Sequence, residues 1–238
     1  ASDRPGSQFI ICAQNHDQIG NRMLGDRLST LVSFEALKLA AGALLLAPNI
    51  PLLFMGEEYG EESPFLYFVS HTDPDLVEAV RQGRKKEFAE FHLEGEYKDP
   101  ESPDTFNQTK LKWEKRQEGK HKVLRELYQH LIHLRRTIPA LKTLDKQNLD
   151  ASAVEEDKLL FLCRRDSIGS QIFCLMNFNQ KEVTTQALPE GIWQKILDSS
   201  ETKWMGSGSK LPEKLIHEQP VTICPQSFAV YELETLAQ

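Results

Sequence analysis

The sequence has few of the features that mark disulfide-rich or metal-binding proteins. Its four cysteines lie far apart, each inside an apolar run, and show neither paired nor metal-ligand spacing. They are Cys12, Cys163, Cys174 and Cys224. This cysteine pattern predicts reduced, buried thiols and therefore a cytoplasmic location. Because no HExxH motif is present either, we expect no metal or other cofactor.

No hydrophobic run is long enough to cross a membrane. The most apolar segment, residues 39–54, is interrupted by Pro48 and Pro51 and is shorter than the roughly 20 residues that a membrane helix needs. Residues 1–7 lack the apolar core of a signal peptide, and the first residue is Ala1 rather than Met. The sequence therefore predicts no membrane partner, and a chain whose start has been cut or processed.

Positive charge is scarce as well. The formal net charge is -7, and no stripe of Lys and Arg carries interleaved aromatic residues. This pattern argues against a nucleic-acid or anionic-membrane partner and favours a neutral substrate. Hydrophobic residues make up 40% and charged residues 26%, as in ordinary globular proteins. The 238 residues allow two domains, and the change near residue 141 from a β/α pattern to short β-rich runs favours that division.

The first part of the chain carries a parallel β/α pattern. An apolar run at residues 9–13 opens into a polar loop. Ser29 or Ser33 then caps an apolar helix that ends before Pro48. A second apolar run, at residues 52–55, opens into another polar loop. This order of strand, loop, buried helix, strand and loop is typical of a parallel sheet.

An excursion follows, and then the texture becomes β-rich. Asp73 begins a predicted helix that runs towards Phe88, and residues 94–119 are predicted to be a long polar loop. An amphipathic helix is predicted at residues 121–136. Short apolar runs separated by turn residues then predict an antiparallel sandwich. These runs are residues 159–163, 171–176 and 221–224.

The polar loop that begins at Gln14 is the strongest candidate for a functional site. A lone Asp17 would be interpreted as a helix cap. Other polar side chains crowd around it, namely Asn15, His16, Gln18, Asn21 and Arg22. Burying so many polar groups by accident costs too much free energy, so the cluster suits a pocket for a hydroxyl-rich ligand. Gly20 permits a close or left-handed turn there, and His16 is favoured as a hydrogen-bonding group because one histidine is too few for a metal site.

Two other groups have competing interpretations. Glu57 and Glu58 follow the second apolar run. An acid there can serve chemistry, but an ion pair with Arg22 or Arg27, or a place at the rim of the site, is favoured. Three aromatic residues form either a sugar-stacking wall or a satellite hydrophobic cluster: Phe65, Tyr67 and Phe68.

These residues carry a resemblance to the α-amylase superfamily of glycoside hydrolases. Residues 9–17, ending in Asn15-His16-Asp17, resemble its fourth conserved segment, at the end of the seventh strand of a (β/α)8 TIM barrel. Longer stretches are similar to the malto-oligosyltrehalose trehalohydrolase family within it: QNHDQIGNRMLGDRL at 14–28, LLFMGEEYGEESPFLYFVSH at 52–71 and DPDLVEAVRQGRKKEF at 73–88. The resemblance implies an α/β fold, with the last strands and helices of the barrel at residues 1–140 and an all-β antiparallel sandwich at residues 141–238.

The resemblance also implies roles for individual residues. Asp17 matches the transition-state stabiliser, which is neither the nucleophile nor the proton donor. The matching segment binds substrate through His16, Gln18, Ile19, Gly20, Asn21 and Arg22. The implied reaction is hydrolysis of the α-1,4 bond next to the terminal trehalose of maltooligosyl trehalose, which releases trehalose with retention of configuration.

The same resemblance implies that essential groups are missing. The nucleophilic Asp and the general-acid Glu of the superfamily belong to the fourth and fifth strands, upstream of residue 1. A retaining mechanism needs two carboxyl groups about 5 Å apart, so the chain alone is predicted to be inactive. Its expected partners are maltooligosyl trehalose or another α-glucan oligosaccharide, and either the missing barrel half or a second copy of the chain.

Three alternatives remain open from the sequence. The first is part of a glucan branching enzyme or of another enzyme that acts on α-glucans. The second is a non-catalytic carbohydrate-binding module, in which Trp193 and Trp204 stack on sugar rings, although at least one of them is expected in the core. The third is a coincidental match.

Overall fold

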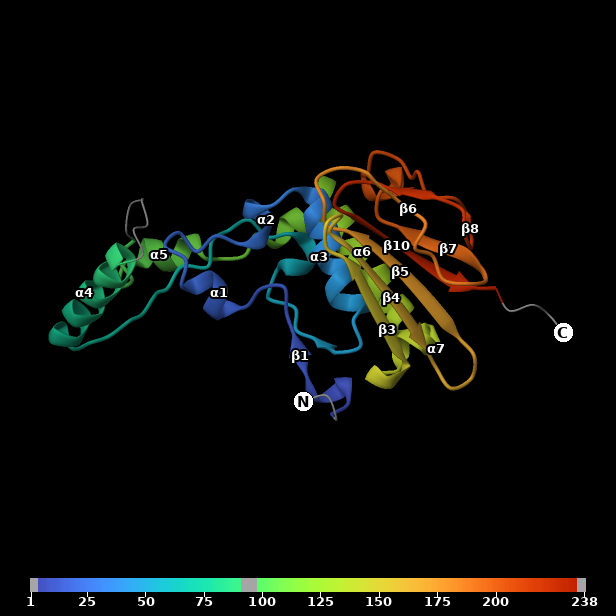
Figure 1. Cartoon of the computed structure of the whole chain (residues 1–238). Coiled ribbons are helices and arrows are strands. Elements are labelled where there is room, and N and C mark those ends of the chain that lie inside the picture. The colour runs from blue at the N-terminus through green and yellow to red at the C-terminus, as the bar shows by residue number, and fades with distance from the viewer. Residues whose placement is uncertain (1–3, 91–97, 235–238) are drawn as a thin grey trace.

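A helical part and a β part make up the molecule, and the computed structural model describes residues 4–90 and 98–234, without the side chains of residues 88–90. The α-helices are α1 (His16–Gly20), α2 (Leu28–Leu31), α3 (Phe34–Leu46), α4 (Pro74–Glu90), α5 (Pro103–Gln108), α6 (Gly119–Thr137) and α7 (Pro139–Lys142). The 3-10 helices are η1 (Gly6–Gln8), η2 (Glu57–Tyr59), η3 (Trp113–Gln117), η4 (Lys146–Asn148) and η5 (Thr202–Trp204). The strands are β1 (Ile10–Ile11), β2 (Ile50–Pro51), β3 (Leu149–Val154), β4 (Leu159–Arg165), β5 (Gln171–Asn177), β6 (Val183–Thr185), β7 (Ile192–Asp198), β8 (Lys214–Ile216), β9 (Val221–Ile223) and β10 (Ser227–Leu233). Helices α3 and α6 lie against the main sheet, whereas α4 and α5 project away from it (Figure 1).

The predicted parallel β/α unit is present. β1 pairs in parallel with β2, with Ile10 opposite Ile50, and α3 lies between the two strands in the chain. The prediction of a second strand at residues 52–55 was wrong, because the ladder ends at Pro51 and the last bond runs from the Leu52 amide to the Ile11 carbonyl, at 2.8 Å. Among the described residues, β1 and β2 pair only with each other. Both strands are therefore as short as the single ladder that joins them.

Helix α3 begins and ends where its sequence signals predict. Ser33 rather than Ser29 is the cap, since its hydroxyl accepts a hydrogen bond from the Ala36 amide at 3.1 Å. The helix packs closely on β10 at Gly42, where an added Cβ would lie 2.7 Å from the Phe228 ring. A glycine is therefore required for this contact between the helical and β parts.

The excursion is more helical than the sequence predicted. α4 begins as expected, with the Asp73 carboxylate accepting a hydrogen bond from the Asp75 amide at 2.9 Å. The predicted loop at residues 94–119 was wrong for its described part, which contains α5 and η3, while residues 94–97 lie outside the described residues. Ser102 caps α5 and Pro103 occupies its first turn, so the Ser-Pro-Asp sequence was the missed helix signal.

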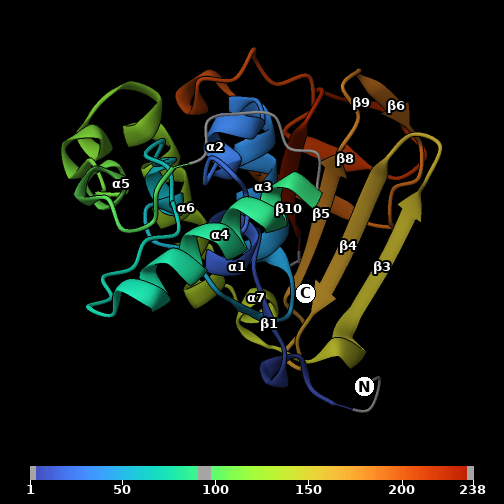
Figure 2. The same ribbon diagram turned by 90° about the vertical axis from the view of Figure 1, so that its left-hand side faces the viewer.

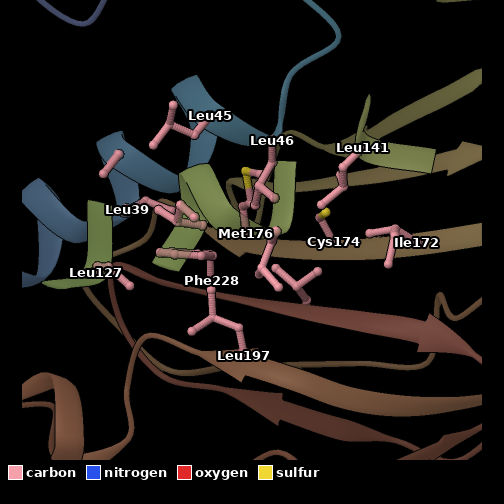
Figure 3. Close-up of a cluster of buried hydrophobic side chains, with 14 of the residues drawn as sticks. Leu39, Leu45, Leu46, Leu127, Leu141, Ile172, Cys174, Met176, Leu197 and Phe228 are labelled. Atoms are coloured by element: carbon pink, nitrogen blue, oxygen red, sulfur yellow. The ribbon is translucent and has the colours of Figure 1, made fainter. Parts of the chain in front are cut away.

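One hydrophobic core lies between the helices and the sheet. The buried leucines of α6 recur at helical spacing, as the amphipathic pattern predicted, and are Leu124, Leu127, Leu131 and Leu134. Figure 3 shows this core, in which Leu39, Leu45 and Leu46 of α3 and Leu127 of α6 approach Ile172, Cys174 and Met176 of β5. Residues on both sides of the predicted 140/141 boundary therefore share a core.

The β part has a six-stranded antiparallel sheet in the order β3-β4-β5-β10-β7-β8, and a separate pair, β6-β9. Side chains alternate across the main sheet, so Cys174 faces the helices while Phe173 and Leu175 belong to a second core on the other face. Both faces are apolar at the centre of the sheet, which explains why β4 and β5 are continuous hydrophobic runs rather than alternating ones. The described part of the chain contains no helix long and apolar enough to cross a membrane.

Candidate functional site

Helix α1 presents the polar residues of the candidate site. Asn15, in extended backbone, caps this short helix, because its side-chain oxygen accepts a hydrogen bond from the Gln18 amide at 2.9 Å. The capping role considered for Asp17 is therefore taken by Asn15. As a result, His16 and Asp17 occupy the first turn, where a negative charge is favoured by the helix dipole.

His16 and Asp17 are side by side and open to solvent. The His16 Nε2 atom lies 3.3 Å from the Asp17 Oδ1 atom, and the two side chains are 71% and 74% exposed. A contact this exposed adds little to stability. Both side chains are accessible from solvent.

Buried residues anchor α1 and the segment before it to the rest of the protein. Ile19 is buried, so its side chain anchors the helix to the protein rather than contacting solvent. Gln14 is also buried, and its side-chain oxygen accepts a hydrogen bond from the Leu28 amide at 3.0 Å. Sequence reasoning assigned no role to Gln14, because nothing in a sequence indicates that its partner lies on the next helix.

The prediction of a close or left-handed turn at Gly20 was wrong. Gly20 has no positive φ, and an added Cβ would meet the Phe65 ring at an ordinary 3.6 Å. The left-handed turn is at Gly25, with a φ of +60°, where an added Cβ would lie 2.6 Å from the backbone of Phe65. Gly25 thus permits the loop after α1 to approach the segment that carries the aromatic residues.

Glu57 is a buried structural acid. Its carboxylate accepts hydrogen bonds from the Phe54 amide at 3.1 Å and from the Tyr128 hydroxyl at 3.0 Å. Burial raises the pKa of Glu57, and these hydrogen bonds oppose that rise. The ion-pair part of the favoured role was wrong, since in the described ranges no ion pair joins Glu57 or the half-buried Glu58 to either predicted arginine.

The two arginines have other partners. Arg22 pairs with Asp26, at 3.3 Å between Nε and Oδ2. Arg27 is buried and donates hydrogen bonds to the carbonyls of Ser63 and Met55, both at 2.7 Å. Arg27 therefore fixes the loop that follows β2, and the sequence distance between these partners explains why the pairing was missed.

A second buried acid, Glu61, organises the same loop. Its carboxylate accepts hydrogen bonds from the Tyr59 hydroxyl at 2.7 Å and the Ser63 amide at 2.8 Å. Burial alone would raise the pKa of Glu61, but the hydrogen bonds outweigh it and the pKa is lowered. The carboxylates of Glu57 and Glu61 are both committed to internal contacts.

A cavity of about 310 Å³ lies beside α1. Its lining residues are His16, Asp17, Gly20, Asn21, Phe65, Leu66, Tyr67 and Phe68. Four of the predicted site residues thus meet the three aromatic residues singled out in the sequence. Gln18 and Arg22 are not part of this lining, and Arg22 lines a much smaller neighbouring hollow with Tyr67 and Arg84.

The other candidate features are structural. Trp193 and Trp204 are both buried in the cores, and the Trp193 indole donates a hydrogen bond to the Glu190 carbonyl at 3.1 Å. Neither ring is available to stack on a sugar, which removes the feature that suggested a binding module. All four cysteines are free thiols. In the described ranges, no three His, Cys, Asp or Glu side chains are grouped to hold a metal ion.

Comparison with known proteins finds sequence similarity to malto-oligosyltrehalose trehalohydrolases. No protein-family model matches the chain. The malto-oligosyltrehalose trehalohydrolase of Rhizobium sp. (strain M-11) is 46% identical over 137 residues, covering 57% of this chain and 23% of the relative. The enzyme of that name from Saccharolobus solfataricus is 50% identical over 111 residues, covering 47% of this chain and 19% of the relative. The match therefore spans about a quarter or less of the length of these curated relatives.

Solved structures share the fold over almost the whole chain. A putative α-amylase from Salmonella typhimurium has a TM-score of 0.78 at 31% identity, covering 98% of this chain and 36% of that one. The α-amylase from H. orenii has a TM-score of 0.56 at 18% identity, covering 94% of this chain and 40% of that one, which shows the fold alone. The predicted fold class is confirmed: the C-terminal part of a (β/α)8 barrel followed by an antiparallel β-sandwich. By sequence, the chain is similar to part of the malto-oligosyltrehalose trehalohydrolases, and its fold is that of α-amylase-type structures.

Proposed function

We propose that this chain is part of a longer malto-oligosyltrehalose trehalohydrolase. The whole enzyme hydrolyses the α-1,4 bond next to the terminal trehalose of maltooligosyl trehalose and releases trehalose. One observation carries the proposal: exposed His16 and Asp17 line a cavity with aromatic rings, in a chain that is 46% identical over 137 residues to an enzyme of that name.

Asp17 is the transition-state stabiliser in this proposal. Its exposed carboxylate is able to accept hydrogen bonds from sugar hydroxyls, and such bonds strengthen as the ring gains oxocarbenium character. The polar contacts to substrate come from His16, Gln18, Asn21 and Arg22, while Ile19 and Gly20 supply backbone and shape. The buried position of Ile19 supports this indirect role.

The nucleophile and the general acid come from the part of the enzyme outside this chain. Glu57 and Glu61 are buried and already accept hydrogen bonds within the protein, so neither is suited to attack a sugar. Neither lines the cavity beside α1. The remaining barrel pairs with residues 1–140, and residues 141–238 form the β domain. The four free thiols support a cytoplasmic location for the whole enzyme.

A second candidate is another enzyme that acts on α-glucans, such as a branching enzyme. The structural likeness to a putative α-amylase, at 31% identity over almost the whole chain, favours keeping it. The products separate the two candidates, since a trehalohydrolase releases trehalose whereas a branching enzyme forms new α-1,6 bonds.

The test compares the longer enzyme with the 238-residue chain. With maltotriosyl trehalose as substrate, we expect the longer enzyme to release trehalose and the isolated chain to release none, because the chain lacks the two carboxyl groups of a retaining site. New α-1,6 branches in place of trehalose would overturn the proposed reaction. Trehalose released by the pure 238-residue chain would overturn the accessory role of Asp17.

A further inference from the structure

Three aromatic side chains form one side of the cavity beside α1, and we name Phe65, Tyr67 and Phe68 the aromatic wall. Tyr67 is 43% exposed and Phe68 is 39% exposed, so both rings present apolar surface to solvent. The polar groups of His16 and Asp17 line the same cavity. Flat apolar rings beside hydrogen-bonding groups match the two kinds of surface that a glucosyl ring presents.

Two rings of the aromatic wall, Tyr67 and Phe68, are each in contact with a residue of another element. The Arg84 guanidinium lies over the Tyr67 ring, 4.6 Å from its centroid. Phe106 packs edge-on against Phe68, with 5.1 Å between ring centroids. Arg84 belongs to α4 and Phe106 to α5, so these two helices supply both contacts.

Arg84 also binds the end of α1. It donates hydrogen bonds to the Gly20 carbonyl at 2.9 Å and to the Asn21 side-chain oxygen at 3.2 Å. Its side chain is only 13% exposed, and it also pairs with Glu87 at 2.8 Å. Figure 2 shows α4 crossing α1, in agreement with these contacts. One guanidinium thus joins α4 to the two sides of the cavity, although Arg84 does not line it.

We propose that α4 and α5 build a stacking subsite for a glucosyl unit of the substrate, with Arg84 as the positioning residue. Arg84 holds the Tyr67 ring and the Asn21 amide at the spacing that the sugar requires. The planar guanidinium is able to stack on a ring and donate in two directions at once, which a lysine ammonium cannot reproduce. This inference rests on the proposed function and identifies how its site binds the oligosaccharide.

The test is a kinetic comparison of Arg84→Met, Arg84→Lys and the matched control Lys85→Met in the longer enzyme. Lys85 is the next residue on α4 and is exposed, so its substitution removes the same charge without touching the cavity. We expect Arg84→Met to raise KM for maltotriosyl trehalose by about 3- to 10-fold, since ring stacking and two hydrogen bonds are lost. The kcat should stay within about twofold because the reacting groups are unchanged.

Arg84→Lys should give a smaller rise in KM, and Lys85→Met should match the unaltered enzyme. An unchanged KM in Arg84→Met, or an equal change in Lys85→Met, would overturn the positioning role. A fall in kcat with unchanged KM would overturn it as well. If Arg84→Met does not fold, the KM of Arg84→Lys decides in the same way. An unaltered enzyme that releases no trehalose would instead overturn the proposed function.

Discussion

At the scale of single residues, surroundings divide the acids near the site into two groups. Glu57 and Glu61 are buried and accept hydrogen bonds from the protein, so their oxygens are occupied. Asp17 is exposed, and within the part of the chain that the structure describes its carboxylate has a long contact with His16 alone. A carboxylate with open acceptor sites is able to bind sugar hydroxyls, and a satisfied buried one is not. Asp17 is therefore the acid near the cavity best suited to a ligand.

The role of Asp17 leads to a prediction about turnover. Replacing it with Asn in the longer enzyme keeps the shape but removes the negative charge that favours an oxocarbenium-like transition state. We expect kcat to fall by about 100-fold or more, with a smaller change in KM. Steady-state trehalose release measures both constants. The control, Asp75→Asn, alters an exposed acid of α4 and should leave them unchanged; equal effects in the two variants would contradict the proposed role.

Part of this residue-level description was predictable from the sequence. The density of polar side chains around Asp17 predicted that this segment is not packed into the hydrophobic core, because burying so many polar groups is costly, and His16 and Asp17 are exposed. The hydrogen-bond partners of Glu57 and Arg27 were not predictable. Arg27 binds the Ser63 carbonyl, and Glu57 binds the Tyr128 hydroxyl, so each partner comes from a distant part of the chain.

At the scale of elements, two arginines satisfy the end of α3. Arg135 donates hydrogen bonds to the carbonyls of Leu45 and Ala47, at 2.7 and 2.6 Å. Arg164 of β4 is fully buried and donates to the Leu46 carbonyl at 2.7 Å and, on α7, to the Leu141 carbonyl at 3.0 Å. The last carbonyls of a helix have no partner within it and attract positive charge. Arg135 therefore joins α6 to α3, and Arg164 joins α3 and α7 to the sheet.

Arg164 gives a prediction about stability. Burial lowers its pKa to about 10, so it remains charged at neutral pH. We expect Arg164→Met to lower the free energy of unfolding by about 3 to 5 kcal/mol, since several buried carbonyls lose their donor. Arg165→Met is the matched control, because that neighbour is 40% exposed and pairs with Asp150 at the surface, so its loss should cost at most about 1 kcal/mol. Urea denaturation measures both, and equal losses would contradict this account.

Helices were easier to predict than the parallel strands. α6 was evident because its leucines recur at helical spacing, and α3 because Ser33 precedes it and Pro48 follows it. The second parallel strand was misplaced, since β2 exists only where its backbone meets β1. Helical hydrogen bonds are local in sequence, whereas the bonds of a parallel ladder join distant residues.

At the scale of the whole molecule, the parallel pair β1-β2 has uncovered apolar side chains. Ile10 is 67% exposed and Ile50 is 40% exposed, and these two residues face one another in the ladder. Parallel strands are normally covered on both faces and have neighbours on both edges. The exposed pair is therefore the surface on which we propose that the rest of the barrel packs.

The 238-residue chain studied alone should consequently self-associate through this pair of strands. We expect the mean mass measured by sedimentation velocity to rise with protein concentration, because the exposed strands and their apolar side chains pack against those of other molecules of the chain. Ile10→Lys should reduce the association. Ile168→Lys is the matched control, since Ile168 is 79% exposed but lies in the turn between β4 and β5. A monomer at every concentration, or equal effects of the two substitutions, would contradict this expectation.

The sequence by itself determined the features that depend on short-range pattern. The end of α3 before Pro48, the leucine spacing of α6, the β-rich second half and the polar cluster around Asp17 were all predictable from neighbouring residues. Only the tertiary structure decided the features that depend on distant contacts. It brought Arg84 to Tyr67 and Asn21, and it buried Glu57 beside Tyr128. The physical reason is that hydrogen bonding and packing between remote segments depend on three-dimensional proximity, which no local spacing in the chain encodes.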